Sequence, residues 1–491
     1  MIRTVRCRAP IAAAALAGLF AILISGCGVP LAPGYKIQKE TLAVHFVPGS
    51  PPHLTVRAEY RLANIGNAPL HFSGGELPGE KNFGRANLRA EVDGKEITLQ
   101  HNLHEAADDW RVPLPAAWRQ KEKLNLVLSY DLAAQSATDP RIFAAANAFY
   151  LNDSGWLPAL MGFKAFLSPA IVRPNPTDLS VTVPNDFRIT ASGQLRGVKK
   201  QGSETQYNFR IRKGDFEPYV LAGQYNEQRI STSNGTVVIW TTKPISAEQA
   251  QKTGAQIAAA LKFYVQNFGP LPRSMKEIYD IQVPEDANKE AGSWESSLLP
   301  AVVYDWVFDP GKSFWTKLGN GFASTFGQWE LGYTWFGHSI RPRPEGAALG
   351  GALTSYASDL LGESNNTGAS RTDIVASDLS DYDTERASAV EKPIISLTVH
   401  DSEDQLQIGG DKIELFMFAL EDKCGSENVR HAISDMVYAL RGEEYGYSDF
   451  RAALEQQCHQ DLGGFFRQWL TQPGIPPDFR ARYENAGGSK P

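Results

Sequence analysis

The chain has 491 residues, of which 42% are hydrophobic and 21% charged, and its formal net charge at pH 7 is −7. This composition is typical of a globular protein and excludes a disordered, collagen-like or disulfide-scaffold chain. At about 150 residues per domain, the length predicts two or three domains. An acidic balance without a run of Lys or Arg argues against a nucleic-acid partner.

The first thirty residues have the pattern of an export signal. Arg3, Arg6 and Arg8 precede an apolar run from Ile11 to Ile24. Because this run is shorter than the ~20 residues that span a bilayer, residues 1–26 are predicted to be a secretory signal peptide. Its removal takes away three Arg and no acidic residue, which changes the net charge from −7 to −10.

The end of this segment, Ile24-Ser25-Gly26-Cys27, resembles the lipobox of bacterial lipoproteins. The resemblance implies a lipid on Cys27 that attaches the mature chain to a membrane, with residues 27–34 as a tether. A plain signal peptide with a coincidental Cys is the alternative. Gly28 stands where lipoproteins retained at the inner membrane often have Asp, so we expect an outer-membrane anchor facing the periplasm.

Residues 35–235 are predicted to form an antiparallel β domain. The segment Leu179-Ser180-Val181-Thr182-Val183 alternates between apolar and polar side chains and ends at a Pro-Asn-Asp turn. The segment 207–211 alternates in the same way. Period-two runs broken by turn residues indicate half-buried strands.

From Ser246 onward the pattern becomes helical. Apolar residues recur at helical spacing from Ala247 to Phe268, and Gly269-Pro270 ends the segment. Further helices are expected over 314–336, 353–361, 413–420, 428–440 and 450–470. The polar stretch from Glu363 to Asp411 is expected to be a long irregular insertion. The chain is therefore predicted to be an α+β protein with a mostly helical second domain over 236–478 and a tail over 479–491.

Two cysteines remain after Cys7 leaves with the signal and Cys27 is modified. Cys424 falls at the end of one expected helix and Cys458 inside another. A disulfide between them suits an antiparallel pair of helices in an exported protein. Two free buried thiols are the alternative.

Four short segments, in order along the chain, resemble one family. They are Gly155-Trp156-Leu157-Pro158, Gly292-Ser293-Trp294-Glu295-Ser296, the run 329–338 (Trp-Glu-Leu-Gly-Tyr-Thr-Trp-Phe-Gly-His) and Phe465-Phe466-Arg467-Gln468-Trp469. The chain resembles the zinc aminopeptidases of the membrane-alanyl-aminopeptidase family (gluzincins). The last three segments there read Gly-Ala-Met-Glu-Asn, His-Glu-Leu-x-His-Gln-Trp-Phe-Gly-Asn and Phe-Phe-x-Gln-Trp. The resemblance implies an N-terminal antiparallel β domain followed by a mostly helical thermolysin-like domain.

The resemblance also implies a zinc site whose ligands this chain has lost. In the family, two His one helical turn apart and a later Glu hold the metal. The corresponding positions here are Trp329, Tyr333 and Ala352, or Gly351 in place of Ala352. An indole has only an N–H donor, a phenol binds metal only when deprotonated, and neither Ala nor Gly has a donor side chain. We therefore expect no zinc and no other cofactor.

Two acidic positions of the family persist. Glu330 matches the general base, but without a metal-activated water it has no nucleophile to deprotonate. Glu295 matches the carboxylate that receives the free amine of a peptide, and amine binding needs no metal. A hydrogen-bonded structural carboxylate is the alternative for Glu295. The family's transition-state Tyr falls near Ile408 here, and Tyr382, the closest upstream phenol, is not expected to replace it.

The sequence thus predicts a lipid-anchored, catalytically inactive aminopeptidase-like protein that binds peptides or a protein partner. An active metallopeptidase with a zinc site rebuilt from Glu330, His338 and Glu345 is one alternative. A purely structural surface scaffold, with aromatic side chains filling the old cleft, is the other.

Two further clusters are interpreted as solvated surface rather than metal sites. One is His101, His104 and Glu105 in the β domain. The other is an acidic run that lacks the Gly of a calcium loop and comprises Asp378, Asp381, Asp383 and Glu385.

Overall fold

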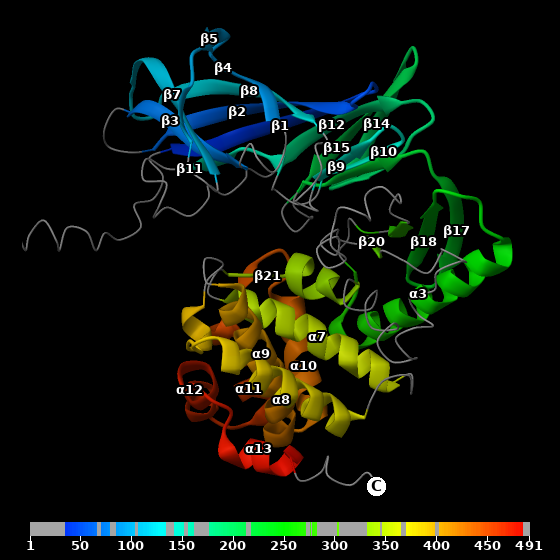
Figure 1. The fold of residues 1–491 in the computed structure, drawn as a ribbon, viewed down its shortest axis with the longest axis vertical. Coiled ribbons are helices and arrows are strands. Elements are labelled where there is room, and N and C mark those ends of the chain that lie inside the picture. The colour runs from blue at the N-terminus through cyan, green and yellow to red at the C-terminus, as the bar shows by residue number, and fades with distance from the viewer. Residues whose placement is uncertain are drawn as a thin grey trace, which may run out of the picture.

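The computed structural model shows a β-rich N-terminal half and a mostly helical C-terminal half (Figure 1). It describes residues 35–65, 70–78, 85–103, 107–133, 142–151, 156–161, 176–212, 218–271, 275, 277–281, 302–303, 331–343, 346–364, 370–397 and 402–484. The predicted α+β class, with an antiparallel β domain before a helical region, is confirmed. Among the described residues, none of the helices combines the length and the apolar character needed to cross a membrane.

The N-terminal half is organised around an eight-stranded sheet. Its strands, in spatial order, are β14 (Gln194–Gln201), β15 (Glu204–Ile211), β12 (Thr177–Pro184), β1 (Tyr35–Val47), β2 (His53–Asn64), β8 (Lys123–Ala133), β4 (Arg85–Val92) and β5 (Lys95–Ile97). Neighbouring strands are antiparallel except β1 and β12. The two alternating sequence runs lie in β12 and β15, as predicted, and β12 alternates between buried and half-buried side chains.

Two four-stranded sheets complete this half. One has the order β13 (Arg188–Ala191), β16 (Val220–Gly223), β10 (Ala148–Leu151) and β9 (Ile142–Ala145). The other has the order β11 (Ala159–Met161), β3 (Leu70–Pro78), β7 (Ala107–Trp118) and β6 (Gln100–Leu103). The indole of Trp156 is buried and donates to the carbonyl oxygen of Pro218 at 2.9 Å. The Trp-Leu-Pro motif is therefore part of the β core.

A third four-stranded sheet begins the second half. Its order is β17 (Asn226–Thr232), β18 (Gly235–Thr241), β19 (Glu277–Ile281) and β20 (Val302–Val303), and helix α3 (Ala247–Phe268) packs against β17 and β18. Helix α3 has the predicted bounds, because Ser246 and Gln249 form a capping box at its start. The boundary expected at residue 235/236 falls inside the hairpin of β17 and β18. The second structural unit therefore begins near Asn226.

Strand β16 lies between two hydrophobic cores. Val220 and Ala222 pack into the core of the eight-stranded sheet, whereas Leu221 packs into the core formed by the third sheet and the helices. Successive side chains of a strand point to opposite faces. One short strand thus contributes to both halves of the molecule.

The helical half contains seven α-helices besides α3 within the described residues. They are α7 (Ala347–Ser364), α8 (Arg371–Ser388), α9 (Glu403–Cys424), α10 (Ser426–Ala439), α11 (Tyr447–Cys458), α12 (Gly463–Thr471) and α13 (Pro477–Glu484). A π-helix η5 (Thr334–Ser339), a 3₁₀ turn η7 (Ile394–Ser396) and two short paired strands, β21 (Arg341–Pro342) and β22 (Glu444–Tyr445), lie among them.

The irregular insertion expected from Glu363 to Asp411 is wrong. Helix α8 fills the middle of this stretch and α9 begins within it, and the side chains of Ser370 and Ser402 cap the two helices. Helix α8 buries only Val375, Leu379 and Tyr382, so its apolar stripe is too narrow to stand out among polar residues. The acidic run that begins at Asp378 is likewise helical, not a solvated loop.

The expected tail is folded over its first six residues. These belong to α13, which buries Phe479 and Tyr483 in the core of the helical half. Arg480 forms a bidentate pair with Asp383 of α8, with both N–O distances at 2.7 Å. Helix α13 therefore closes the helical half against α8.

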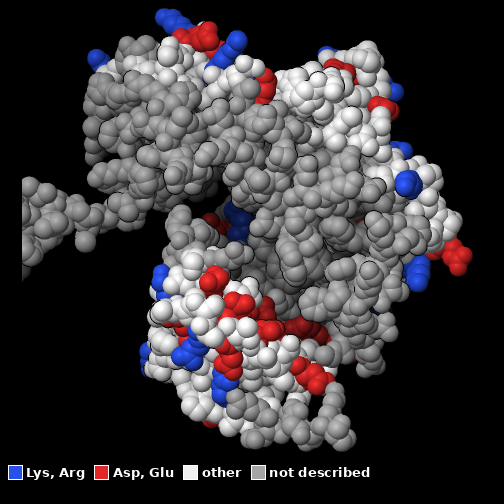
Figure 2. Space-filling view, viewed as in Figure 1, with Lys and Arg blue, Asp and Glu red and all other residues white. Residues whose placement is uncertain are grey.

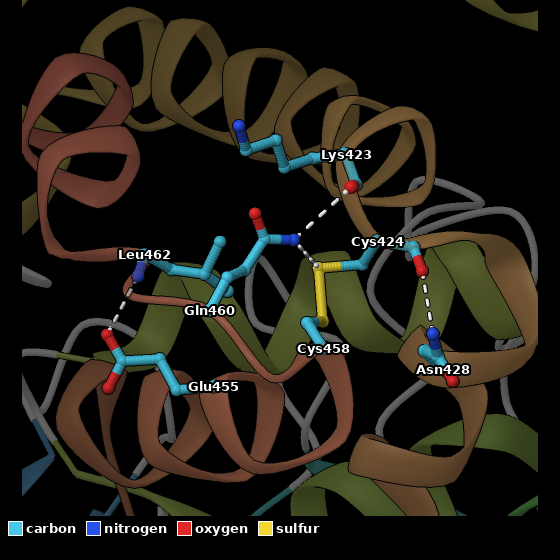
Figure 3. The surroundings of a disulfide bond; sticks show 7 residues. All are labelled: Lys423, Cys424, Asn428, Glu455, Cys458, Gln460 and Leu462. Atoms are coloured by element: carbon cyan, nitrogen blue, oxygen red, sulfur yellow. Dashed lines mark hydrogen bonds between the residues drawn. A yellow bond between two sulfur atoms is a disulfide. The ribbon is translucent and has the colours of Figure 1, made fainter.

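A disulfide joins Cys424, at the end of α9, to Cys458, at the end of α11 (Figure 3). The two Cα atoms are 5.3 Å apart, and helix α10 lies in the enclosed loop. Around the bond, Asn428 donates to the carbonyl oxygen of Cys424 at 2.8 Å, and Gln460 donates to that of Lys423 at 3.4 Å. Of the two states considered for these cysteines, the structure shows the bonded one.

A buried ion pair holds several segments of the helical half together. The ammonium of Lys412 in α9 is fully buried and lies 2.7 Å from the carboxylate of Glu391, which is 3% exposed. The same carboxylate accepts from the hydroxyl of Tyr382 and the backbone N–H of Gly474, each at 2.8 Å. Lys412 also donates to the carbonyl oxygen of Gln472. The pair thus connects α8, α9 and the segment between α12 and α13.

Replacement of Lys412 by Met is expected to lower the free energy of unfolding by about 1.5–3 kcal/mol, because Glu391 loses its buried partner and keeps only the partly exposed guanidinium of Arg386, 3.3 Å away. Urea unfolding followed by circular dichroism measures the change. Lys423→Met is the matched control, since Lys423 is exposed on the same helix and its replacement should cost less than about 0.5 kcal/mol. Equal effects of the two substitutions would contradict the assignment.

Candidate functional site

The described residues include part of the degenerate zinc motif. Leu331, Gly332 and Tyr333 are helical and lead directly into the π-helix η5. Tyr333, His338 and Ala352 can therefore be placed. The other residues assigned to a site or to a lipid lie outside the described residues, and they are Cys27, Glu295, Trp329, Glu330 and Glu345. The same holds for His104 and Glu105, and of His101 only the backbone in β6 is described.

Trp335 connects the helical segment that carries the zinc-motif residues to α3. Its indole is fully buried, donates to the carbonyl oxygen of Gly269 at 2.9 Å, and stacks on Tyr264 with ring centroids 5.2 Å apart. Phe336 packs edge-to-face on Phe268 at 5.3 Å. Because these contacts satisfy the indole N–H and bury both rings, the Trp-Phe pair of the motif serves the core.

The carbonyl oxygen of Phe336 accepts from the hydroxyl of Tyr445, in β22, at 2.9 Å. In an α-helix this oxygen would bond to an N–H four residues on, but a π-helix shifts the backbone pattern by one residue. The hydroxyl of Tyr445 thus supports an irregular backbone where the motif ends.

Tyr333, which the motif resemblance assigns to the second ligand position, lies against its own helix. A Cβ atom built at Gly337 would be only 2.3 Å from the Tyr333 ring, so the ring covers the backbone of that glycine. The ring also meets His338 edge-to-face, with centroids 4.9 Å apart. Gly337 therefore provides the space that the phenol ring occupies, four residues along the helix.

Ala352, which the motif resemblance assigns to the third ligand position, is 2% exposed on helix α7. Helix α7 packs against η5, as the helix carrying a third ligand must, yet the side chain at this position is a methyl group. Gly351, the neighbouring candidate, also has no donor atom. The described donor set thus consists of one phenol, and with the indole of Trp329 it does not fit a zinc ion, which needs three protein ligands.

His338 lies on η5 between the Tyr333 ring and Arg341. Burial lowers the pKa of His338 well below its ordinary value, and the nearby charge of Arg341 lowers it further. The imidazole is therefore neutral at pH 7. Sequence reasoning overlooked Arg341 as a neighbour of His338, although only three residues separate them.

No phenol takes the transition-state position at the two places considered. Ile408 is buried at 1% exposure in α9. The hydroxyl of Tyr382 donates to Glu391 at 2.8 Å, and burial raises the pKa of that phenol. Tyr382 is therefore part of the ion-pair network described above.

His338 is expected to make the protein less stable in acid. Its folded-state pKa is depressed, so the unfolded chain binds an extra proton as the pH falls below about 6.5, and stability is lost there. His338→Gln should reduce the fall in Tm between pH 7 and pH 5. His431→Gln, at an exposed position of α10, should leave it unchanged. A fall in Tm that is identical in wild type and His338→Gln would refute the assignment.

Solved structures of M1 zinc metallopeptidases have the same fold. An M1 zinc metallopeptidase from Deinococcus radiodurans matches with a TM-score of 0.61 and 16% identity, over 91% of this chain and 95% of that chain. A substituted variant of an M1 zinc metallopeptidase from the same organism, bound to a Tyr-Ser-Ala substrate, gives 0.61 and 16% over 90% and 96%. A substituted two-domain M1 zinc metallopeptidase bound to L-arginine gives 0.61 and 17% over 90% and 96%.

The sequence itself matches no protein-family model. No curated protein matches it either. At this level of identity the structural likeness concerns the fold alone. The chain has the two-domain architecture of the M1 zinc metallopeptidases, the gluzincin aminopeptidases that its motifs resemble.

Proposed function

We propose that this protein is a lipid-anchored aminopeptidase-like protein that does not hydrolyse peptides, and that it binds peptides or a protein partner through the region of the old active site. The observation that carries the proposal is the chemistry at the ligand positions. Tyr333 presents a phenol packed on Gly337, and Ala352 presents a buried methyl group. Neither replaces an imidazole or a carboxylate as a zinc ligand.

The surroundings of Tyr333 also oppose a metal ion. A phenol binds a cation as phenolate, and the positive charge of Arg341 lies close enough to lower the pKa of the adjacent His338. The same charge repels a divalent cation placed beside that imidazole. This argument also weighs against the alternative zinc site built from Glu330, His338 and Glu345.

The lipid anchor is proposed from the sequence. The apolar run before Cys27 is too short to span a bilayer, and small residues directly precede the cysteine. Attachment through Cys27, with Gly28 following it, is consistent with the outer membrane and a periplasmic orientation. The remainder of the chain then lies at the membrane surface of the cell envelope.

Glu295 supplies the proposed recognition of a peptide. It matches the family's amine-binding carboxylate, and such binding is a charge-assisted hydrogen bond that needs no metal. Two of the M1 structures with this fold contain Tyr-Ser-Ala and L-arginine, respectively. In those proteins the fold therefore binds small ligands that bear a free amine. The competing possibility is a scaffold whose cleft is filled by aromatic side chains and takes no peptide.

Metal content tests the loss of zinc chemistry. The soluble form, residues 28–491, is expected to retain no stoichiometric zinc after incubation and dialysis, because its ligand positions lack donors. A variant with Trp329→His, Tyr333→His and Ala352→Glu restores the family's donor set and should gain zinc. Stoichiometric zinc in the wild type, lost in His338→Ala, would instead establish a rebuilt site and return the protein to the active peptidases.

Peptide binding tests the proposed recognition. A peptide with a free N-terminus should bind at least about tenfold more tightly than its N-acetylated form, because acetylation removes the charge-assisted hydrogen bond. Glu295→Gln should abolish that preference, while Glu248→Gln, at an exposed position of α3, should retain it. Calorimetry measures both affinities. Equal affinity for the two peptides, or no binding of either, would contradict the proposal.

A further inference from the structure

Three packed helices bring four carboxylates together in the helical half. Asp359 lies on α7, Asp378 on α8, and Asp411 and Glu414 on α9, and α9 packs against both α7 and α8. Glu363, Asp381 and Glu385 lie on the same helices and add negative charge to the cluster. Figure 2 shows acidic side chains gathered in a band across this face of the helical half.

Among the described residues, these four carboxylates differ from several nearby acids because no ion pair with Lys or Arg neutralises them. Nearby acids are neutralised by ion pairs, namely Glu391 by Lys412, Glu421 by Arg371, Asp422 by Arg482 and Asp383 by Arg480. Within the described part of the chain, no Lys or Arg forms an ion pair with Asp359, Asp378, Asp411 or Glu414. The cluster is thus an uncompensated group of acids.

Asp411 is the carboxylate of the cluster for which ionisation is most clearly unfavourable. Its side chain is 7% exposed, and its Oδ1 accepts from Gln407 at 2.8 Å. Its Oδ2 is buried without a hydrogen-bond partner among the described residues. An ionised carboxylate oxygen in such a position loses its hydration and gains nothing in return. A protonated carboxyl avoids most of this cost.

Burial and mutual repulsion favour the protonated forms. Burial, with the charge of Glu414 and other acids, raises the pKa of Asp359 to about 8 and of Asp378 to about 9. Burial likewise raises the pKa of Glu414 to about 7, against the opposing hydrogen bond of Ser355, and that of Asp411 to about 6. From the neighbouring helix α3, Tyr264 faces Asp359 as a neutral phenol.

We propose that Asp359, Asp378, Asp411 and Glu414 form a proton-binding centre, and that protonation of these carboxylates allows α7, α8 and α9 to pack together. As the pH rises and the protons leave, the carboxylates repel one another across the helix interfaces. The helical half then loosens under alkaline conditions and tightens near neutral pH. The four carboxylates are not part of the zinc motif, although Tyr264 lies next to both Asp359 and Trp335. The proposal does not depend on the proposed peptide binding.

The sign of the effect follows from proton linkage. The folded-state pKa values are raised, so the folded chain binds more protons than the unfolded chain, and stability falls as the pH rises from the unfolded toward the folded values. At pH 7 the excess is about 2.5 protons per chain, of which Asp359 and Asp378 hold about two and Glu414 about half of one. Tm should therefore fall between pH 7 and pH 9, a window in which His338 stays neutral.

Thermal unfolding of the full soluble chain at pH 7 and pH 9 tests the centre. Asp378→Asn and Asp359→Asn should each flatten the fall in Tm, because an amide cannot ionise. Asp404→Asn, an exposed position on α9, should leave the fall as in wild type. An unchanged fall in both cluster variants would overturn the proposal.

A second measurement needs no variant, in case these substitutions prevent folding. Calorimetric unfolding of the wild type at pH 8, in two buffers with different ionisation enthalpies, counts the protons exchanged. Release of about one proton or more on unfolding is expected, since Asp378 keeps its proton at this pH only in the folded state. No release, or proton uptake, would overturn the proposal.

Discussion

The contact between Trp335 and Tyr264 sets the geometry of the candidate site. The indole stacks on the phenol at 5.2 Å and donates to Gly269 just beyond the end of α3, so the motif helix cannot rotate or slide without breaking both interactions. The direction in which Tyr333 and His338 project follows from this anchorage. The packing of α7, the helix that carries Ala352, against η5 follows from the same anchorage. In the proposed interpretation, the residues at the zinc-ligand positions have changed while Trp335 and Phe336 of the same run remain in the core.

This division between scaffold and ligands is consistent with the proposal that the peptidase fold keeps its shape without zinc chemistry. Trp335 and Phe336 are core residues of the motif, so the residue types at these positions depend on how well the side chains pack. The residue types at metal-ligand positions depend instead on their donor atoms. Once the metal is dispensable, an aromatic ring such as that of Tyr333 can occupy space on the same helix by lying over Gly337. Glu295 needs no zinc to attract an amine, which is why the proposed function concerns binding.

The fold was predictable where apolar periodicity is strong. The alternation in β12 and β15 and the capped, amphipathic α3 match their predictions, because single-element patterns carry that information. Helix α8 was missed because it buries only three of its 18 residues. The helix expected over 450–470 is interrupted at His459, whose left-handed backbone conformation between α11 and α12 leaves no periodic signal in the sequence. The ion pair of Glu391 and Lys412 and the position of Arg341 beside His338 depend on tertiary contacts, which one sequence does not display. The proposed loss of the zinc ligands stays a prediction from the sequence, since it concerns residue chemistry at the family's spacing.

The disulfide between α9 and α11 has a consequence for how the exported chain matures. A chain with the signal removed holds three cysteines, at positions 27, 424 and 458, and these allow three different pairs. If the proposed acylation of Cys27 precedes oxidation, it removes one thiol and leaves a single possible pair. The order of the two modifications then selects the native bond without any correction of mispaired cysteines. Lipid attachment at Cys27 would in this way prevent wrong disulfide pairing in a domain roughly 400 residues further along the chain.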